Sequence, residues 1–167
     1  MNIRRATLAD IPAIMSIVKE AVPLMQAAGN FQWNDSYPNP EAFEGDVALN
    51  QLWVADIDGR VAGASAITTE QYPEYEQAGL DISQPAIVTH RLVVSPYYRG
   101  LGIAESLLMQ AEYEADRRGI PLLRIDTNKE NKAAQKLFVK LGYIFAGEIG
   151  LAFRPGMRFV CLEKKLT

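Results

Sequence analysis

The chain contains one cysteine, Cys161, and one histidine, His90, among its 167 residues. A lone cysteine excludes an internal disulfide, and we expect Cys161 to be a small buried apolar residue rather than a nucleophile. No run of about 18 apolar residues occurs, so no membrane span is expected. The basic pair Arg4 and Arg5 is not followed by the apolar segment of a secretory signal. These absences favour a cytoplasmic protein with no membrane partner.

The chain also has fewer basic than acidic residues. Lys and Arg number 17 against 20 Asp and Glu, which gives a formal net charge of −3. A broad nucleic-acid surface needs clustered Lys and Arg, so no nucleic-acid partner is expected. A local anion site needs only a few donors and remains compatible with this charge. The 49% hydrophobic content suits one globular domain over residues 1–167, and no metal is expected as a cofactor.

The periodicity of apolar residues predicts a mixed α/β order. A first helix begins after Thr7, and we expect Pro23 to break or kink it, with a second helix running to Ala28. Asp58-Gly59 is typical of a hairpin turn, and residues 70–84 form a loop or a long hairpin tip. Further helices are predicted at 40–50, from 104 to about 118, and at 131–141. The predicted strands are 2–6, 52–57, 61–68, 86–94, 122–126, 143–149 and 157–164. If exposed, the last strand offers an edge for a second subunit, which leaves a homodimer open.

A glycine turn, Arg99–Ala104, joins one predicted strand to the next predicted helix. A helix start offers unpaired N–H groups and the positive end of the helix dipole, which together bind phosphate. Gly100 and Gly102 remove side chains that would keep a ligand from the backbone, and Arg99 adds a cation. Such turns are often purely structural, however. No Gly-Lys-Ser/Thr follows, and Glu105 stands where a dinucleotide fingerprint needs glycine.

Three segments together resemble the GNAT superfamily of acetyl-CoA-dependent N-acetyltransferases. In residues 91–104, Arg99, Gly102 and Ala104 fill the family pattern Arg/Gln-x-x-Gly-x-Gly/Ala. The second segment is Asp126-Thr127-Asn128 with Asn131, Ala134 and Leu141-Gly142-Tyr143, and the third is the opening Ile3–Thr7 with Asp10. The combined spacing is specific, whereas no single segment is.

The resemblance implies a GNAT-like α/β fold, with a central, mixed but mostly antiparallel sheet flanked by helices. The sheet would part in a V-shaped split between the strand that ends near Val94 and the strand 122–126. Acetyl-CoA would enter this split as cosubstrate, where unpaired backbone groups can bind its amides. The cofactor-binding residues implied are Leu92, Val94, Arg99, Gly100, Leu101, Gly102, Ile103, Ala104, Asn128, Asn131, Ala134 and Phe138.

The implied reaction is direct attack of a primary amine on the thioester through a tetrahedral intermediate, which needs a base and oxyanion donors. Strand alternation predicts that His90, Leu92 and Val94 share one face. His90 is then the candidate base, against the alternative of a packed strand histidine, and a strand N–H near Val94 is the candidate oxyanion donor.

The general acid is where this sequence departs from the family. Family members often carry tyrosine where Phe138 stands, and phenylalanine donates no proton. Water or another tyrosine would then protonate the departing thiolate, or the thiolate would leave without an acid. Tyr143 is one alternative, although we expect it to pack in the core. The departure leaves a non-catalytic acetyl-CoA-binding sensor or regulatory module as an alternative function.

Aromatic residues in predicted loops are candidates for an acceptor pocket, since a cationic amine is attracted to aromatic faces. They are Phe31, Trp33, Tyr37, Tyr72 and Tyr75, with Glu70, Glu74 and Glu76 nearby. Ordinary loop packing and solvated glutamates are the alternative. The acceptor is a small-molecule or peptide amine, and small amines, polyamines, amino acids, antibiotics and protein termini all stay open.

Overall fold

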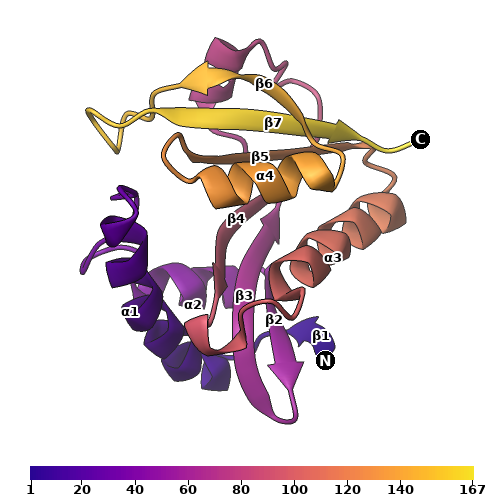
Figure 1. The fold of residues 1–167 in the computed structure, drawn as a ribbon. Coiled ribbons are helices and arrows are strands. Elements are labelled where there is room, and N and C mark those ends of the chain that lie inside the picture. The colour runs from indigo at the N-terminus through magenta and orange to yellow at the C-terminus, as the bar shows by residue number, and fades with distance from the viewer.

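The computed structural model describes residues 1–167 and contains one seven-stranded sheet in the order β1-β2-β3-β4-β5-β7-β6 (Figure 1). The strands are β1 (Asn2–Arg5), β2 (Leu52–Ile57), β3 (Arg60–Thr68), β4 (Ile87–Val94), β5 (Leu122–Asn128), β6 (Ile144–Ile149) and β7 (Phe159–Lys165). The helices are α1 (Ile11–Ala27), α2 (Pro40–Ala48), α3 (Ile103–Arg118) and α4 (Lys132–Lys140). Three 3₁₀ segments are η1 (Leu8–Asp10), η2 (Pro73–Ala78) and η3 (Pro96–Tyr98).

Strand pairing is antiparallel everywhere except between β4 and β5. The predicted α/β class and the mixed, mostly antiparallel sheet are therefore confirmed. The predicted hairpin is confirmed too. Asp58 and Gly59 have φ of 52° and 83°, and the Gly59 N–H donates to Asp56 Oδ1 at 2.7 Å.

The two faces of the sheet carry different helices. Along β2, Trp53 and Ala55 pack in the cluster that contains α3, whereas Leu52 and Val54 pack in the cluster of α1 and α2. This alternation is what a strand buried on both faces requires. A third cluster lies around β6, β7 and η2. No helix of the structure has both the length and the apolar character to cross a bilayer.

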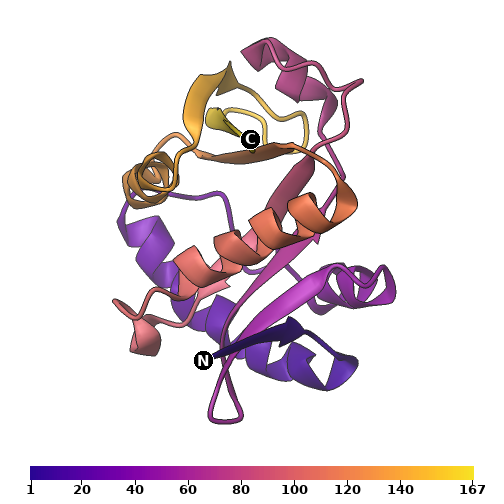
Figure 2. The ribbon, with the colours of Figure 1, turned by 90° about the vertical axis from the view of Figure 1, so that its right-hand side faces the viewer.

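The sheet parts at its centre, as the predicted V-shaped split requires. β4 and β5 pair only at Ile87↔Leu123 and Val88↔Arg124. Beyond Val88, β4 has a neighbouring strand on one side only. Figures 1 and 2 show β5, β6 and β7 as an upper layer with α4, above the layer of β1, β2 and β3. The two layers diverge from this short parallel ladder.

Two sequence-based expectations are wrong. Of the break or kink expected at Pro23, the break and the separate second helix are absent, because α1 continues as one helix to Ala27. The proline removes a single N–H donor, while Val18 and Val22 before it and Met25 after it pack in the same cluster. Tertiary packing therefore outweighs the local cost.

The last strand is not an exposed edge. β7 pairs with β5 on one side and with β6 on the other. β6 and β1 are the edges of the sheet instead, so the argument for a subunit contact through the last strand is lost.

Gly63 on β3 should tolerate no side chain. A Cβ there would lie 2.8 Å from Ile103 Cγ2 and 3.0 Å from the Val93 carbonyl oxygen. We expect Gly63→Ala to lower the free energy of unfolding by about 1–3 kcal/mol, because the backbone neighbour must move. The matched control is Gly45→Ala in α2, which meets nothing within 4 Å and should gain about 0.5–1 kcal/mol. Urea unfolding of both variants measures this, and equal stabilities would contradict the close approach.

Candidate functional site

The turn before α3 is built on two left-handed glycines. Gly100 has φ of 78° and Gly102 has φ of 72°, a region that other residues adopt only with strain. Gly102 is the N-cap of α3 and contributes no capping side chain, and nothing lies within 4 Å of the Cβ position of either glycine. Arg99 and Leu101 are exposed, whereas the side chain of Ile103 is buried in the core. The N-terminus of α3 therefore presents open backbone donors, with a cation beside them.

A bulge interrupts β4 at Arg91. Arg91 has φ of 52°, and the pairing with β3 shifts between Ala64 and Ala66. The predicted alternation therefore does not hold across Arg91. Leu92 and Val94 pack against the α3 cluster, whereas His90 contacts Tyr72 and the Glu70 backbone. The expectation that His90, Leu92 and Val94 share one face is wrong.

Arg91 itself is held by a buried ion pair. Its guanidinium donates to both carboxylate oxygens of Asp46, each at 2.7 Å, and its Nη1 donates to the Tyr37 hydroxyl at 3.2 Å. The Arg91 side chain is 12% exposed and that of Asp46 is 4% exposed. The Asp46 carboxylate raises the pKa of Arg91 against the opposing effect of burial. Arg91 is therefore a fixed, neutralised cation that anchors the bulge.

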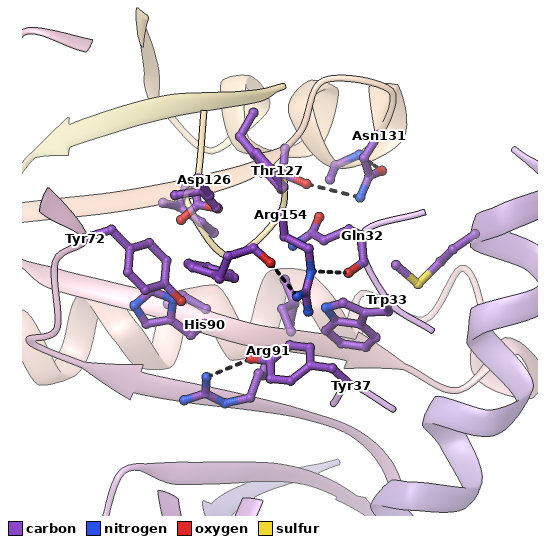
Figure 3. A pocket seen from close by; sticks show the side chains of 18 of the residues that line it. Gln32, Trp33, Tyr37, Tyr72, His90, Arg91, Asp126, Thr127, Asn131 and Arg154 are labelled. Atoms are coloured by element: carbon purple, nitrogen blue, oxygen red, sulfur yellow. Dashed lines mark hydrogen bonds between the residues drawn. The ribbon is translucent and has the colours of Figure 1, made fainter. Parts of the chain in front are cut away.

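A cavity of about 120 Å³ opens beside the split (Figure 3). It receives side chains from both halves of the sheet and from the loops that follow α1 and β6. Eight of the residues singled out in the sequence line it: Trp33, Tyr37, Tyr72, His90, Leu92, Asn131, Ala134 and Phe138.

Several other predicted site residues lie elsewhere. Phe31 is exposed and Tyr75 is fully buried, and neither lines the cavity. Asn128 is buried and donates its N–H to Gln32 Oε1 at 3.1 Å. Val94 and the turn Arg99–Ala104 lie outside the cavity wall, along the strand and helix that lead from the split.

Acid–base groups gather at one end of the cavity. The His90 ring lies 5.1 Å from the Tyr72 ring between centroids, and its Nε2 is 2.9 Å from the Glu70 carbonyl oxygen. The Tyr75 hydroxyl donates a hydrogen bond to Asp126 Oδ2. Burial raises the pKa of Asp126, while the positive charge of His90 and the Tyr75 hydrogen bond act in the opposite direction. Burial likewise raises the pKa of Tyr72, with Asp126 adding to the shift.

Asn131 has a structural task at the other wall. As the N-cap of α4, it accepts the Ala134 N–H at 3.2 Å and donates from Nδ2 to Thr127 Oγ1 at 3.2 Å. These two bonds tie the start of α4 to β5. Phe138, about two turns further along α4, lines the cavity from a buried position.

The site thus combines a parted sheet, a glycine turn that opens α3, and a cavity beside the split. A comparison of the sequence with models of known families then gives a match. The model of the acetyltransferase (GNAT) family covers residues 15–143. The chain belongs to the GNAT acetyltransferase family. It is therefore an acyltransferase, and the resemblance found in the sequence is confirmed.

Known GNAT proteins agree with this assignment. A 5-NmdU N-acetyltransferase from Pseudomonas phage PaMx11 is 24% identical over 141 residues, which cover 80% of this chain and 91% of the relative. A GNAT-family acetyltransferase from Streptococcus agalactiae 2603 has a TM-score of 0.84 at 27% identity, over 99% of this chain and 95% of that one. An acetyltransferase from Salmonella typhimurium, solved with its cofactor acetyl-CoA, has a TM-score of 0.71 at 22% identity, over 100% and 94%.

Sequence reasoning missed four polar residues that line the cavity of this GNAT chain: Gln32, Arg91, Asp126 and Arg154. Asp126 carried a usable signal, because it is the one acid in β5 and belongs to the segment Asp126-Thr127-Asn128 that resembles the family, although no site role was predicted for it. Arg91 and Arg154 carried none, since a bulge and a long loop turn them toward the cavity.

Asp126 gives a testable pH dependence. Its pKa in the folded chain is raised above the reference value of 3.8 by burial. Between these two pKa values the folded chain holds a proton that the unfolded chain has lost, so Asp126 lowers stability as pH rises. Asp126→Asn does not titrate and keeps an oxygen for Tyr75. We expect its stability relative to the parent chain to increase as pH rises above about 4, the pKa of the unfolded carboxyl.

Asp81 provides a control of opposite sign. Hydrogen bonds from the Ser83 hydroxyl and N–H lower the pKa of this exposed carboxyl. Its stabilising effect is therefore lost as pH falls, and Asp81→Asn should lose stability relative to the parent chain as pH rises. Urea unfolding at several pH values measures both slopes. A flat difference for Asp126→Asn would show that Asp126 is not shifted in this direction.

Proposed function

We propose that this GNAT chain transfers an acetyl group from acetyl-CoA to a primary amine. The observation that carries the proposal is the parting of β4 from β5, with the open N-terminus of α3 at the end of β4. A split supplies unpaired backbone groups for a chain of amides, and a helix start supplies donors for phosphate. Both are needed for a ligand that has a pyrophosphate at one end and a pantetheine arm.

The residues at this site fit acetyl-CoA. Arg99 and the backbone from Gly100 to Ala104 would hold the pyrophosphate, and β4 at Leu92 and Val94 would hold the pantetheine amides. Asn128, Asn131, Ala134 and Phe138 stand on the opposite side of the split, on or next to β5 and α4. The Salmonella relative solved with acetyl-CoA supports this choice of cofactor. When bound, acetyl-CoA supplies an activated acetyl thioester and a thiolate leaving group.

His90 is the proposed base. The Glu70 carbonyl oxygen can only accept a hydrogen bond, so the contact at 2.9 Å places a proton on His90 Nε2 in the neutral ring. Nδ1 then carries the lone pair that takes a proton from the incoming amine, directly or through water. Tyr72 packs against the ring and fixes its plane. A strand N–H near Val94 is the proposed oxyanion donor.

No side chain is assigned as general acid. Phe138 has no proton to give, and Tyr143 is buried in the α3 cluster and does not line the cavity. A thiol of ordinary acidity, with a pKa of about 8.5, leaves as thiolate without an acid. The protein then needs one base and one oxyanion donor.

Acetyl-CoA binding should depend on Gly102 and not on Gly119. Both glycines flank α3 with positive φ, 72° and 67°, and both have open space at Cβ. Alanine at either position should therefore cost about 1–2 kcal/mol of stability. Only Gly102→Ala places a methyl group at the proposed phosphate cradle, so its Kd for acetyl-CoA should rise about 10-fold or more.

Thermal unfolding with and without acetyl-CoA measures this, since a ligand at about 100 times its Kd stabilises by about 2.7 kcal/mol. The Gly119→Ala chain should keep the stabilisation shown by the parent chain. Equal acetyl-CoA binding by both variants would show that the turn is not part of the cofactor site. If acetyl-CoA does not stabilise the parent chain, the proposal that this chain binds acetyl-CoA is contradicted.

Turnover should depend on His90. We expect His90→Gln to lower kcat by about 100-fold or more, because a positioned base contributes about 10²–10⁴-fold. Release of free CoA thiol across a pH series measures kcat. Stabilisation by acetyl-CoA is the control, and it should stay at the level of the parent chain. A kcat that is unchanged at every pH would exclude His90 as the base.

A further inference from the structure

Arg154 brings a second cation into the cavity, and this one has no acidic partner. It lies in the loop between β6 and β7 and lines the cavity. Its Nε donates to the Gln32 carbonyl at 3.1 Å and its Nη1 to the Phe153 carbonyl at 3.0 Å. Its guanidinium carbon lies 4.9 Å from the centroid of the Tyr37 ring. None of these contacts is a carboxylate.

The charges around Tyr37 do not cancel. Tyr37 touches two arginines, Arg91 through its hydroxyl and Arg154 through its ring face. Asp46 neutralises Arg91 in a bidentate pair, which leaves the charge of Arg154. Asp126 is the remaining acid that lines the cavity. Burial raises the pKa of Asp126, which favours its uncharged form. A ligand that carries one negative group would pair with Arg154, the arginine of this cavity that has no carboxylate partner.

The shape of Arg154 selects the kind of anion. A guanidinium has five N–H donors in a plane, and two of them are used by backbone carbonyls. Three donors remain. The tyrosine face and the two carbonyls hold the group in one orientation, as Figure 3 shows. A fixed planar fork of this kind matches the two oxygens of a carboxylate.

The rest of the cavity sets the size and character of the ligand. The volume of about 120 Å³ admits a small molecule. Trp33, Tyr72 and Phe153 supply aromatic walls, with the Tyr72 and Phe153 ring centroids 5.2 Å apart. Figure 3 shows Asp126 and His90 on one side of Arg154, with Trp33 and Tyr37 on the other. An anion on Arg154 thus leaves the opposite end of a short ligand near the proposed base.

We propose that the acceptor is a free amino acid with an apolar side chain, bound by its carboxylate to Arg154 and presenting its amine to His90. This substrate class rests on the proposed acetyl transfer. The aromatic walls take the side chain, and Arg154 discriminates an amino acid from a simple amine. A phosphate is the other anion that an arginine takes, so an amine-bearing deoxynucleotide is the competing acceptor.

The test compares each amino acid with its own decarboxylated amine. Phenylalanine is paired with phenethylamine, and methionine with 3-(methylthio)propylamine. For the parent chain, kcat/KM for the amino acid should exceed that for the paired amine by about 10- to 100-fold, the worth of a charged hydrogen-bonded pair. Arg154→Gln should abolish most of this ratio through a higher KM for the amino acid. Arg154→Lys should restore part of it, because the charge remains and the fork does not.

Arg158→Gln is the matched control. Arg158 is an exposed arginine in the same loop, it pairs with Glu148 at 3.0 Å, and it does not line the cavity. This variant should keep the parent ratio. Equal use of amino acids and paired amines by the parent chain would overturn the proposal. So would an equal loss for both substrates in Arg154→Gln, or a preference for the amine-bearing deoxynucleotide.

A binding measurement separates this inference from the proposed reaction. Titration calorimetry of the amino acid in the presence of CoA needs no turnover. Arg154-dependent binding of the amino acid without any acetylation would contradict the proposed reaction and support the carboxylate site. Acetylation of simple amines without Arg154-dependent amino-acid binding would contradict the carboxylate site and support the proposed reaction.

Discussion

The parting of β4 and β5 is the constraint on which the rest of the molecule depends. Two residue pairs, Ile87↔Leu123 and Val88↔Arg124, join the halves of the sheet, and every later residue of β4 lacks a strand on that side. Unpaired backbone groups inside a protein are costly unless a partner satisfies them. A sheet that opens in this way therefore needs either a ligand or polar side chains along the gap. The cavity, the α4 cap at Asn131 and the glycine turn all lie along or at the end of this opening.

The bulge at Arg91 shows how the opening is kept. A non-glycine residue with φ of 52° is strained by about 1–3 kcal/mol and persists only where its surroundings fix it. The surroundings here are the two hydrogen bonds to Asp46 and the one to Tyr37. Both ends of the ion pair are buried, so removal of either partner would leave an uncompensated charge, at a cost of about 3–5 kcal/mol. The buried ion pair thus stabilises the strained conformation of the strand at Arg91. This conformation lets four consecutive β4 residues, 89–92, line the cavity, which a regular strand does not allow.

The sequence predicts those features whose physical cause is local. The Asp58-Gly59 hairpin, the start of α3 after the glycine turn and the helix predicted at 131–141 each follow from residues within a few positions. The failures share a different cause. Pro23 stays helical because apolar neighbours on both sides are buried, Tyr75 sinks into the core to meet Asp126, and β7 is enclosed by β5 and β6. Arg154 is placed by contacts with the segment around Gln32, 122 positions away in the chain. Packing between residues far apart in the sequence determines all four of these placements. A short stretch of the sequence does not contain the residues involved.

The electrostatics of the cavity also bear on the nucleophile. An amine attacks only when uncharged, and most amines are protonated near neutral pH. Arg91 is paired with Asp46, whereas Arg154 donates only to backbone carbonyls, so the cavity contains one arginine without a carboxylate partner, and more than half of its lining residues are hydrophobic. Both properties disfavour an ammonium group and lower the pKa of a bound amine. A carboxylate on the acceptor would offset the charge that attracts it, while its amine stands close to His90 in a site that favours the neutral form. Arg154 would then serve binding, and desolvation by the hydrophobic walls would favour the neutral amine.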